Sequence, residues 1–301
     1  RYLSRVPYSF EFDGAILPGF LLSSEKIRSL HEFQLGADDV VIASYPKSGT
    51  TWASEVLSAI AHEGDIELLT RIKMEERVCW LELDARRLSP NSILHLPYSY
   101  MDSSSAKKRV WFTHLPVQHL PPTIREGKCK LLYVARNPKD QAVSYFHFHR
   151  SAAFLGQQTD LTFDEFFRLF CSGCICLGSW FEHVLGYWKF IQNNQQAKFI
   201  CYEDMKRDLM AEMESIEGFV GVPLSLEQRA AVVEHCSFQS MKDNKMTNRD
   251  GLPMVDNKVS KFMRKGVVGD WKNHFTVAQN EAFDAIYKSE MEKSGLMFEF
   301  E

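Results

Sequence analysis

The 301 residues suffice for one large α/β domain or for two smaller ones, and a composition of 45% hydrophobic and 25% charged residues is ordinary for a globular protein with a sizeable core. A formal net charge of −4 excludes the overall basic field that gathers nucleic acid, although a small anion can still bind at a local basic site. No apolar run approaches the roughly 20 residues that span a bilayer, and residues 1–12 have no signal-peptide core, so we expect no membrane partner.

Short apolar runs alternate with helical patterns along the chain. Residues 40–45 (VVIASY) predict a buried strand, which a Pro/Gly turn joins to a helix over 50–62. Further strands are predicted over 109–114, 130–136 and 197–202. This alternation favours a single α/β domain over residues 1–301, with a central parallel sheet flanked by helices. Ligands of such sheets bind beyond the carboxyl ends of the strands.

The other segments are mostly helical. Pro138 suits the first turn of a helix whose body is 140–150. Apolar residues at helical spacing predict further helices over 163–170, 180–191 and 276–293. The segment 242–270 has little periodicity, and a loop of this length inside a compact domain is usually functional or mobile.

The seven cysteines are an odd number spread over a long chain, which fits reduced thiols and predicts a cytoplasmic protein. Cys171, Cys174 and Cys176 form a C-x-x-C-x-C cluster that could hold a metal. No second group of Cys or His stands at ligand spacing, so we expect structural thiols and no metal site.

The turn after the first predicted strand reads Pro46-Lys47-Ser48-Gly49-Thr50-Thr51-Trp52. Backbone N–H groups at the start of a helix, aided by the helix dipole, form an anion site, and Gly49 lets the backbone approach closely. Because Lys47 precedes the glycine, the turn is not a Walker A loop. The alternative is an ordinary strand–turn–helix corner with a solvated lysine.

This turn resembles the 5′-phosphosulfate-binding loop of the cytosolic sulfotransferases, and further matches follow in the family's order. Residues 136–140 (RNPKD), with Ser144, resemble the 3′-phosphate site, and 261–271 (KFMRKGVVGDW) resemble the C-terminal nucleotide motif. The family's dimer motif, K-x-x-x-T-V-x-x-x-E, is matched by Lys272, Thr276, Val277 and Glu281. The resemblance extends from about residue 10 to the end of the chain.

The resemblance implies a P-loop-like nucleotide-binding architecture that binds PAPS (3′-phosphoadenylyl sulfate) and leaves adenosine 3′,5′-bisphosphate as product. It places two groups of residues at the nucleotide. The first comprises Lys47, Ser48, Gly49, Thr50, Thr51, Trp52, Arg136 and Ser144. The second comprises Tyr202, Cys236, Phe238, Phe262, Met263, Arg264, Lys265 and Gly266. The family usually has Thr at the position of Cys236.

Catalysis is assigned by the same resemblance. His114, in a T-H-L-P motif, would be the base that takes the proton of the acceptor, and Lys47 would stabilise charge on the leaving phosphate. Taken alone, a histidine is more often structural. Many family members have a second Lys where this chain has Phe112, so charge stabilisation rests more on the other two residues.

The implied reaction is direct in-line transfer of a sulfonate group from PAPS to a hydroxyl or amine of a small molecule. The resemblance suggests an acceptor pocket formed by Phe148 and His114, with contributions from the N-terminal segment near Phe20 and from 246–255. Aromatic walls suit a flat or apolar acceptor such as a phenol or a steroid.

Two rival functions remain open at this point. A P-loop kinase would need Mg²⁺ and an acidic residue at a strand end, and the acidic pair nearest a predicted strand end is Glu203-Asp204. A non-catalytic nucleotide-binding protein is the other rival, although the presence of both Lys47 and His114 argues against it. We expect a homodimer through the C-terminal motif.

Overall fold

The computed structural model describes residues 2–84, 86, 106–249, 252 and 254–301. Its centre is a five-stranded parallel sheet with the strand order β4-β5-β3-β6-β7. In chain order the strands are β3 (Asp39–Ser44), β4 (Val78–Trp80), β5 (Arg109–Thr113), β6 (Lys130–Ala135) and β7 (Ala197–Cys201). A separate antiparallel hairpin pairs β1 (Phe10–Phe12) with β2 (Ala15–Leu17). The predicted single α/β domain with a central parallel sheet is confirmed.

Each strand predicted from an apolar run is present and ends one residue earlier than predicted. The last residue of each predicted strand is in fact the first residue beyond the sheet, so it lies at the carboxyl edge of the sheet. β4 was missed because three residues are too few to show a pattern.

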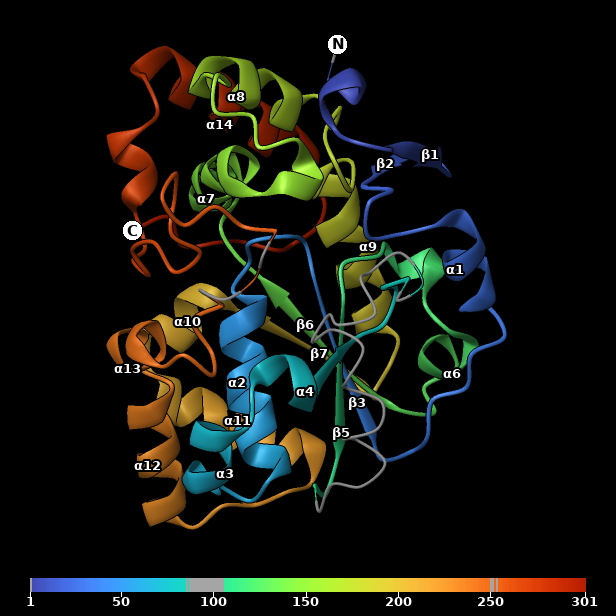
Figure 1. Ribbon diagram of the computed structural model, residues 1–301, viewed down its shortest axis with the longest axis vertical. Coiled ribbons are helices and arrows are strands. Elements are labelled where there is room, and N and C mark those ends of the chain that lie inside the picture. Colours follow the sequence, from blue (N-terminus) through green and yellow to red (C-terminus); the bar gives the residue numbers. More distant parts are fainter. Residues whose placement is uncertain (1, 85, 87–105, 250–251, 253) are drawn as a thin grey trace.

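Helices cover both faces of the sheet, as Figure 1 shows. One buried cluster packs α2 (Thr50–Ala61), α11 (Leu209–Val220) and α12 (Leu226–His235) against strand residues such as Val40 and Ile42. The other cluster uses the alternate residues Val41 and Ala43. It contains α7 (Pro138–Ser151), α8 (Phe163–Cys171), α9 (Trp180–Gln192) and α14 (Val277–Met291). Strands with both faces buried explain the continuous apolar runs of the sequence.

The shorter helices connect these layers. They are α1 (Ser24–Ser29), α3 (Ile66–Arg71), α4 (Met74–Arg77), α6 (Pro122–Arg125), α10 (Tyr202–Arg207) and α13 (Phe238–Asp243). Single 3₁₀ turns are η1 (Leu3–Arg5), η4 (Val117–His119), η5 (Ala153–Leu155) and η6 (Asp270–Asn273).

The segment predicted to have little regular structure, 242–270, divides between elements and loop. α13 reaches Asp243 and η6 begins at Asp270, and the described residues between them hold no helix and a single strand bridge, from Val255 to Ala152. Within the described residues no helix has the length and hydropathy of a membrane span. The seven cysteines are free thiols, and the described side chains form no cluster of three potential metal ligands.

Candidate active site

Three of the residues that directly follow the parallel strands meet at one cavity. Tyr45, His114, Arg136 and Tyr202 come immediately after β3, β5, β6 and β7. The last three line the cavity together with the start of α2 and the segment after α13. The carboxyl edge of the sheet, where parallel sheets bind their ligands, is therefore the candidate site.

The start of α2 is built to accept an anion. Its N-cap is Gly49, which makes no side-chain capping bond, so the first N–H groups of the helix lie open at a cavity wall formed by Thr50, Thr51 and Trp52. Gly49 has a φ of 101°, and a Cβ atom there would lie 2.7 Å from the Tyr202 ring. A side chain at this position would therefore both strain the backbone and clash.

Lys47 projects from the turn before α2 into the cavity. Its Nζ lies 4.4 Å from the ring centroid of Phe148 and 4.1 Å from that of Phe262. In the part of the chain that the structure describes, no carboxylate lies within ion-pair distance of it. Burial, and then the positive charge of Arg136, lowers the pKa of Lys47 to about 7. A bound anion would relieve this uncompensated charge.

His114 has one ring nitrogen fixed by the fold. Nδ1 lies 2.8 Å from the carbonyl oxygen of Ser44, and this oxygen accepts only, so Nδ1 carries the proton and Nε2 carries the lone pair. The backbone N–H of His114 donates to Glu82 at 2.8 Å, and its carbonyl lies 3.1 Å from Nε2 of His183. Burial, followed by the charges of Arg249 and Lys47, lowers the pKa of His114 to about 4. The imidazole is therefore neutral at physiological pH.

Arg136 follows β6 and His114 follows β5, and the two lie on opposite sides of the start of α2. Its guanidinium lies 4.4 Å from the centroid of the Tyr202 ring and donates to the carbonyl of Val267 at 3.1 Å. The ion pair with Asp140 is long, at 3.9 Å, and Nε is buried without a partner. Ser144, two turns along α7, lines the same cavity. Together they offer a cation and a hydroxyl to a phosphate.

Aromatic rings flank this phosphate-binding region. The rings of Trp52 and Tyr202 pack edge to face with centroids 5.3 Å apart, and Phe238 and Met263 line the cavity beside them. A Cβ atom on Gly266, which has a φ of 65°, would lie 2.1 Å from the Phe238 ring. The C-terminal segment can therefore pass this ring only as glycine.

Arg264 and Lys265 share one carboxylate. Arg264 pairs with Asp270 at 2.7 Å and Lys265 pairs with it at 2.6 Å, while His274 lies 3.5 Å away. Burial acts to raise the pKa of Asp270, but the hydrogen bonds from Lys265 and Arg264 hold it well below its ordinary value. Both cations also line the cavity, within reach of an anionic ligand.

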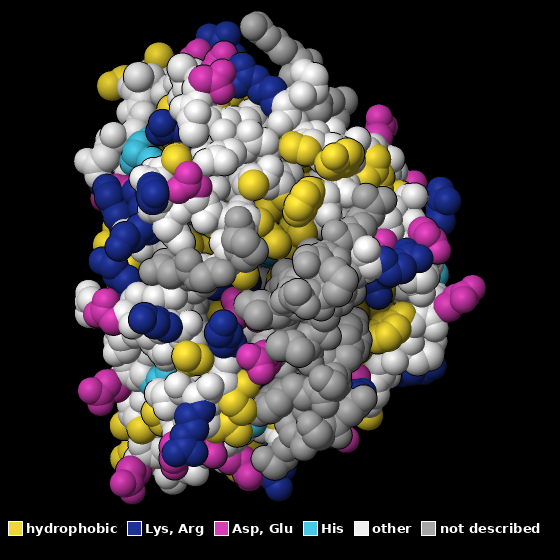
Figure 2. All heavy atoms as spheres, viewed as in Figure 1, with side chains coloured by type: hydrophobic (Ala, Val, Ile, Leu, Met, Phe, Trp, Pro, Cys, Tyr) yellow, Lys and Arg dark blue, Asp and Glu magenta, His cyan; other side chains and the backbone are white. Residues whose placement is uncertain are grey.

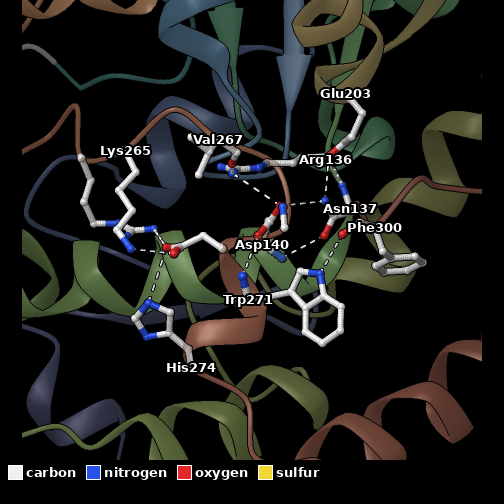
Figure 3. A network of polar contacts seen from close by, with 12 residues as sticks. Arg136, Asn137, Asp140, Glu203, Lys265, Val267, Trp271, His274 and Phe300 are labelled. Carbon is white, nitrogen blue, oxygen red and sulfur yellow. Dashed lines mark hydrogen bonds and ion pairs between the residues drawn. The ribbon is translucent and has the colours of Figure 1, made fainter.

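A polar network fixes the C-terminal segment to the start of α7 (Figure 3). Asp140 accepts from the backbone N–H groups of Gly269 at 2.7 Å and Trp271 at 2.9 Å. The indole N–H of Trp271 in turn donates to the carbonyl of Phe300. Asn137 caps α7 and is held by Glu203. All of these contacts are made between residues of the protein itself. The position of the segment 264–271 is therefore set by α7.

The half of the cavity beyond His114 and Lys47 is mainly apolar. Trp80 stacks on Phe112 with centroids 5.4 Å apart, and Phe148 packs edge to face on Phe154 at 5.6 Å. The remaining apolar wall residues include Pro18, Leu22, Leu155, Leu177, Leu252, Met254 and Val255. Figure 2 shows one outer face, with Lys and Arg gathered at its left edge and hydrophobic side chains in its upper centre. The cavity thus has a cationic half and an apolar half.

Residues 37–295 match the family described as the sulfotransferase domain. The chain belongs to the sulfotransferase family. Sulfotransferase 1C2 of Rattus norvegicus is 43% identical over 273 residues, which are 89% of this chain and 88% of that protein. Sulfotransferase 1A1 of Canis lupus familiaris is 42% identical over 277 residues, covering 91% and 90%. The crystal structure of mouse sulfotransferase SULT7A1 complexed with PAP superposes with a TM-score of 0.75 at 32% identity over 95% of each chain.

The family resemblance stated from the motifs is confirmed by these matches. Most residues predicted for the site of this sulfotransferase line the cavity: Lys47, Gly49, Thr50, Thr51, Trp52, His114, Arg136, Ser144, Phe148, Tyr202, Phe238, Phe262, Met263, Arg264, Lys265 and Gly266. They come from segments up to 219 residues apart in sequence and are assembled by the parallel order of the strands.

Three predicted residues of the sulfotransferase do not line the cavity. Phe20 is 40% exposed, because a turn at Pro18 directs Leu21 and Leu22 inward and Phe20 outward. The Ser48 hydroxyl bonds within the protein, to the Tyr45 carbonyl at 2.8 Å. Cys236 is fully buried, and it is its carbonyl that holds the Trp52 indole. The side chains of Phe20, Ser48 and Cys236 therefore lie outside the cavity wall, and their predicted roles remain predictions.

The sequence analysis missed several cavity residues of the sulfotransferase. Glu75, Trp80 and Glu82 come from around the short strand β4, and Arg249 comes from the loop after α13. Burial raises the pKa of Glu82, whose carboxylate holds the His114 backbone. The W-x-E sequence that begins at the last residue of β4 was the available signal, but a strand of three residues gave no reason to place it at the sheet edge.

Three of the predicted dimer residues lie at the start of α14 and the fourth lies in the preceding η6, all outside the cavity wall. Thr276 is the N-cap of α14, Val277 is 76% exposed at its first position, and Glu281 is exposed one turn later. Lys272, in η6, pairs with Glu301 at 2.8 Å. An apolar side chain this exposed, framed by charges, is compatible with a contact surface.

Proposed function

We propose that the protein transfers a sulfonate group from PAPS to a hydroxyl or amine of a small aromatic or apolar acceptor. The observation that carries the proposal is the position of His114. Its Nδ1 is held by the Ser44 carbonyl, so the lone pair of Nε2 is available in a cavity that also holds Lys47 and the open start of α2. A base, a cation and an anion-binding helix end converge there.

The reaction is a direct in-line displacement. PAPS supplies an activated sulfonate on a phosphate leaving group. The acceptor oxygen or nitrogen forms the new bond to sulfur, the bond from sulfur to the bridging phosphate oxygen breaks, and its electron pair stays on that oxygen. Nε2 of His114 takes the acceptor proton, and Lys47 stabilises the negative charge that builds on the leaving oxygen. The ammonium of Lys47, which pairs with no carboxylate among the described residues, fits this role.

The nucleotide is recognised at both of its anionic ends. We assign the 5′-phosphosulfate to the start of α2, from Gly49 to Trp52, and the 3′-phosphate to Arg136, Ser144 and the segment 264–266. The adenine is assigned to the rings of Trp52, Tyr202 and Phe238, since aromatic faces suit base stacking. The mouse relative complexed with PAP supports a ligand of this size and charge.

A kinase function is not favoured by the strand ends. Two acidic residues lie two positions beyond a described strand end, Glu82 after β4 and Glu203 after β7. Glu203 Oε1 accepts from the backbone and the side-chain amide of Asn137, and Glu82 Oε1 accepts from the backbone N–H of His114. Both carboxylates are committed to bonds within the protein, so they are poorly placed to hold the Mg²⁺ of a phosphotransferase.

The proposal also covers the domain organisation, the cellular location and the oligomeric state of the protein. We infer that residues 1–301 act as one sulfotransferase domain and that the protein works in the cytoplasm, as the name of cytosolic sulfotransferase 1 of Danio rerio says of that relative. We also infer a homodimer formed through Lys272, Thr276, Val277 and Glu281.

The proposed function is tested by one transfer assay. The protein is incubated either with ³⁵S-labelled PAPS or with γ-³²P-labelled ATP and Mg²⁺, together with a panel of phenols, steroids and amines. Label transferred from PAPS, and none from ATP, is expected. Transfer from ATP would identify a kinase, and binding of PAP without transfer to any acceptor would identify a nucleotide-binding protein.

A further inference from the structure

Arg249 is a second cation in the apolar half of the cavity. It lies in the loop after α13, and its guanidinium carbon is 6.0 Å from the ring centroid of Phe112 and 5.6 Å from that of Phe262. Its side chain is 13% exposed. A charged group buried this far needs a partner, or a ligand that it can bind.

The partner present in the protein only partly meets this need. Glu75, at the start of α4, places Oε1 3.8 Å from Nη1 of Arg249, which is an ion pair without a short hydrogen bond. Nε of Arg249 is buried, and none of the described residues accepts a hydrogen bond from it. By contrast, the buried Arg77 makes short bonds to Glu55 and Ser58. The guanidinium of Arg249 thus retains donors for an incoming acceptor atom.

Arg249 is also close to the proposed reacting groups. It shares the Phe262 ring with Lys47, whose Nζ is 4.1 Å from the same centroid. Among the charged groups that depress the pKa of His114, Arg249 has a larger effect than Lys47. Both cations adopt a left-handed backbone conformation, with φ of 73° at Lys47 and 59° at Arg249. Residues without a glycine's freedom rarely adopt this conformation unless the surrounding structure holds them there.

We propose that Arg249 is a further catalytic residue, whose guanidinium binds oxygen atoms of the sulfonate group as the group passes from PAPS to the acceptor. The inference rests on the proposed function. The moving group carries negative charge on three oxygens. Lys47 is assigned to the leaving oxygen and the start of α2 to the phosphosulfate, so a donor on the acceptor side would stabilise the sulfonate oxygens as the group moves away from α2. On β5 the cavity wall near His114 is the apolar ring of Phe112. The planar fork of an arginine suits two oxygens at once.

The test compares R249M, R249K and the double variant R249M/F112K. Methionine keeps most of the apolar contact with the two rings and removes the charge. We expect R249M to lower kcat by roughly 10²–10³, the usual effect of removing one such donor, with little change in affinity for PAP. R249K should retain part of the activity. R249M/F112K should recover part of the activity. The Arg249 guanidinium lies over the Phe112 ring, so a lysine at position 112 on β5 would place a cation near the place of the lost one.

The matched control is R71M, which removes an arginine that is 72% exposed and pairs with Glu67 on the surface of α3. It should have the activity of the wild type. R249M leaves the Glu75 carboxylate without its partner, which could unfold the variant. In that case R249M/E75Q, which removes both charges, is compared with the wild type instead.

Two outcomes would overturn the proposal. One is wild-type kcat in R249M, or in the folded R249M/E75Q. The other is a rise in the KM of the acceptor at unchanged kcat, which would make Arg249 an acceptor-binding residue. An inactive wild-type protein in the PAPS assay would instead refute the proposed function, so the two failures are distinguishable.

Discussion

The carbonyl oxygen of Ser44 lies 2.8 Å from Nδ1 of His114, and this contact joins the ends of two neighbouring strands, β3 and β5. The last residue of β3 thereby determines which nitrogen of the imidazole carries the proton. The same β3 leads directly into Lys47, so the spacing between the proposed base and the proposed cation is set by strand pairing. Such rigid placement is what a transfer between two bound molecules requires.

The first prediction concerns the need for a base. H114A should abolish nearly all transfer to an alkyl alcohol, while an acidic phenol, already partly ionised, should lose less. The affinity for PAP should change little. The measurement is the ratio of mutant to wild-type kcat across phenols of graded acidity. A ratio independent of phenol acidity, together with a lowered Tm, would make His114 a packing residue.

The pH dependence of His114 follows from the same burial. Its folded pKa is about 4, below the ordinary value of an imidazole, so the residue is protonated only below about pH 4 and is a competent base above it. In the free protein, the main titration of the ring signals measured by NMR should therefore lie near pH 4, and a smaller change near pH 7 is expected from Lys47. A main titration near pH 6.5 would contradict the depressed pKa.

The second prediction concerns Lys47. K47A should lower kcat by roughly 10²–10³ and weaken PAP binding much less, because the ammonium acts mainly on charge that develops during transfer. K245A removes an exposed lysine outside the cavity wall and serves as the control. Equal losses in turnover and in PAP affinity would show that Lys47 binds nucleotide without a specific role in transfer.

The third prediction concerns the close passage of Gly266 by Phe238. G266A places a methyl group where the ring stands and forces an alanine to a φ of 65°. Strain of this kind costs about 1–3 kcal/mol, so we expect the affinity for PAP to fall at least about fivefold. The measurement is calorimetric titration with PAP. G218A is the control, because a Cβ there meets nothing within 4 Å, and in the helix α11 it should stabilise by about 0.5–1 kcal/mol. Unchanged PAP affinity in G266A would mean that this segment does not contact the nucleotide.

The fourth prediction concerns self-association. V277E places a charge at the exposed start of α14 and should yield monomers that still bind PAP. The control is L226E at the start of α12, a residue that is 73% exposed and belongs to a helix at the other end of the view in Figure 1. Light scattering at several concentrations measures the mass. A wild type that is monomeric at high concentration would refute the dimer.

The parts of the fold that the sequence predicts are those with a strong local signal. The buried strands have continuous apolar runs, and Asn137-Pro138 marks the start of α7 through a cap and a fixed φ. The side of a turn that a residue occupies has no such signal: Phe20 looks as apolar as Leu22, yet only Leu22 reaches the cavity. This distinction depends on tertiary packing.

Local sequence patterns also fail to predict part of the site. Glu75 and Arg249 are 174 positions apart and appear in the sequence as ordinary surface charges. Their proximity results from α4 packing beside the loop after α13, where the backbone N–H of Met74 donates to the carbonyl of Met246. Likewise, the sequence alone indicates a cationic segment at 264–265 but not that both cations pair with Asp270.

That pairing has a consequence for nucleotide exchange. Arg264 and Lys265 both pair with the single carboxylate of Asp270, at 2.7 and 2.6 Å, which offsets one of their two positive charges. Under the proposed function, a 3′-phosphate would compete with this internal carboxylate for the two cations. We therefore expect Asp270 to act as an internal counter-ion that weakens the binding of the product and makes its release an exchange of one anion for another.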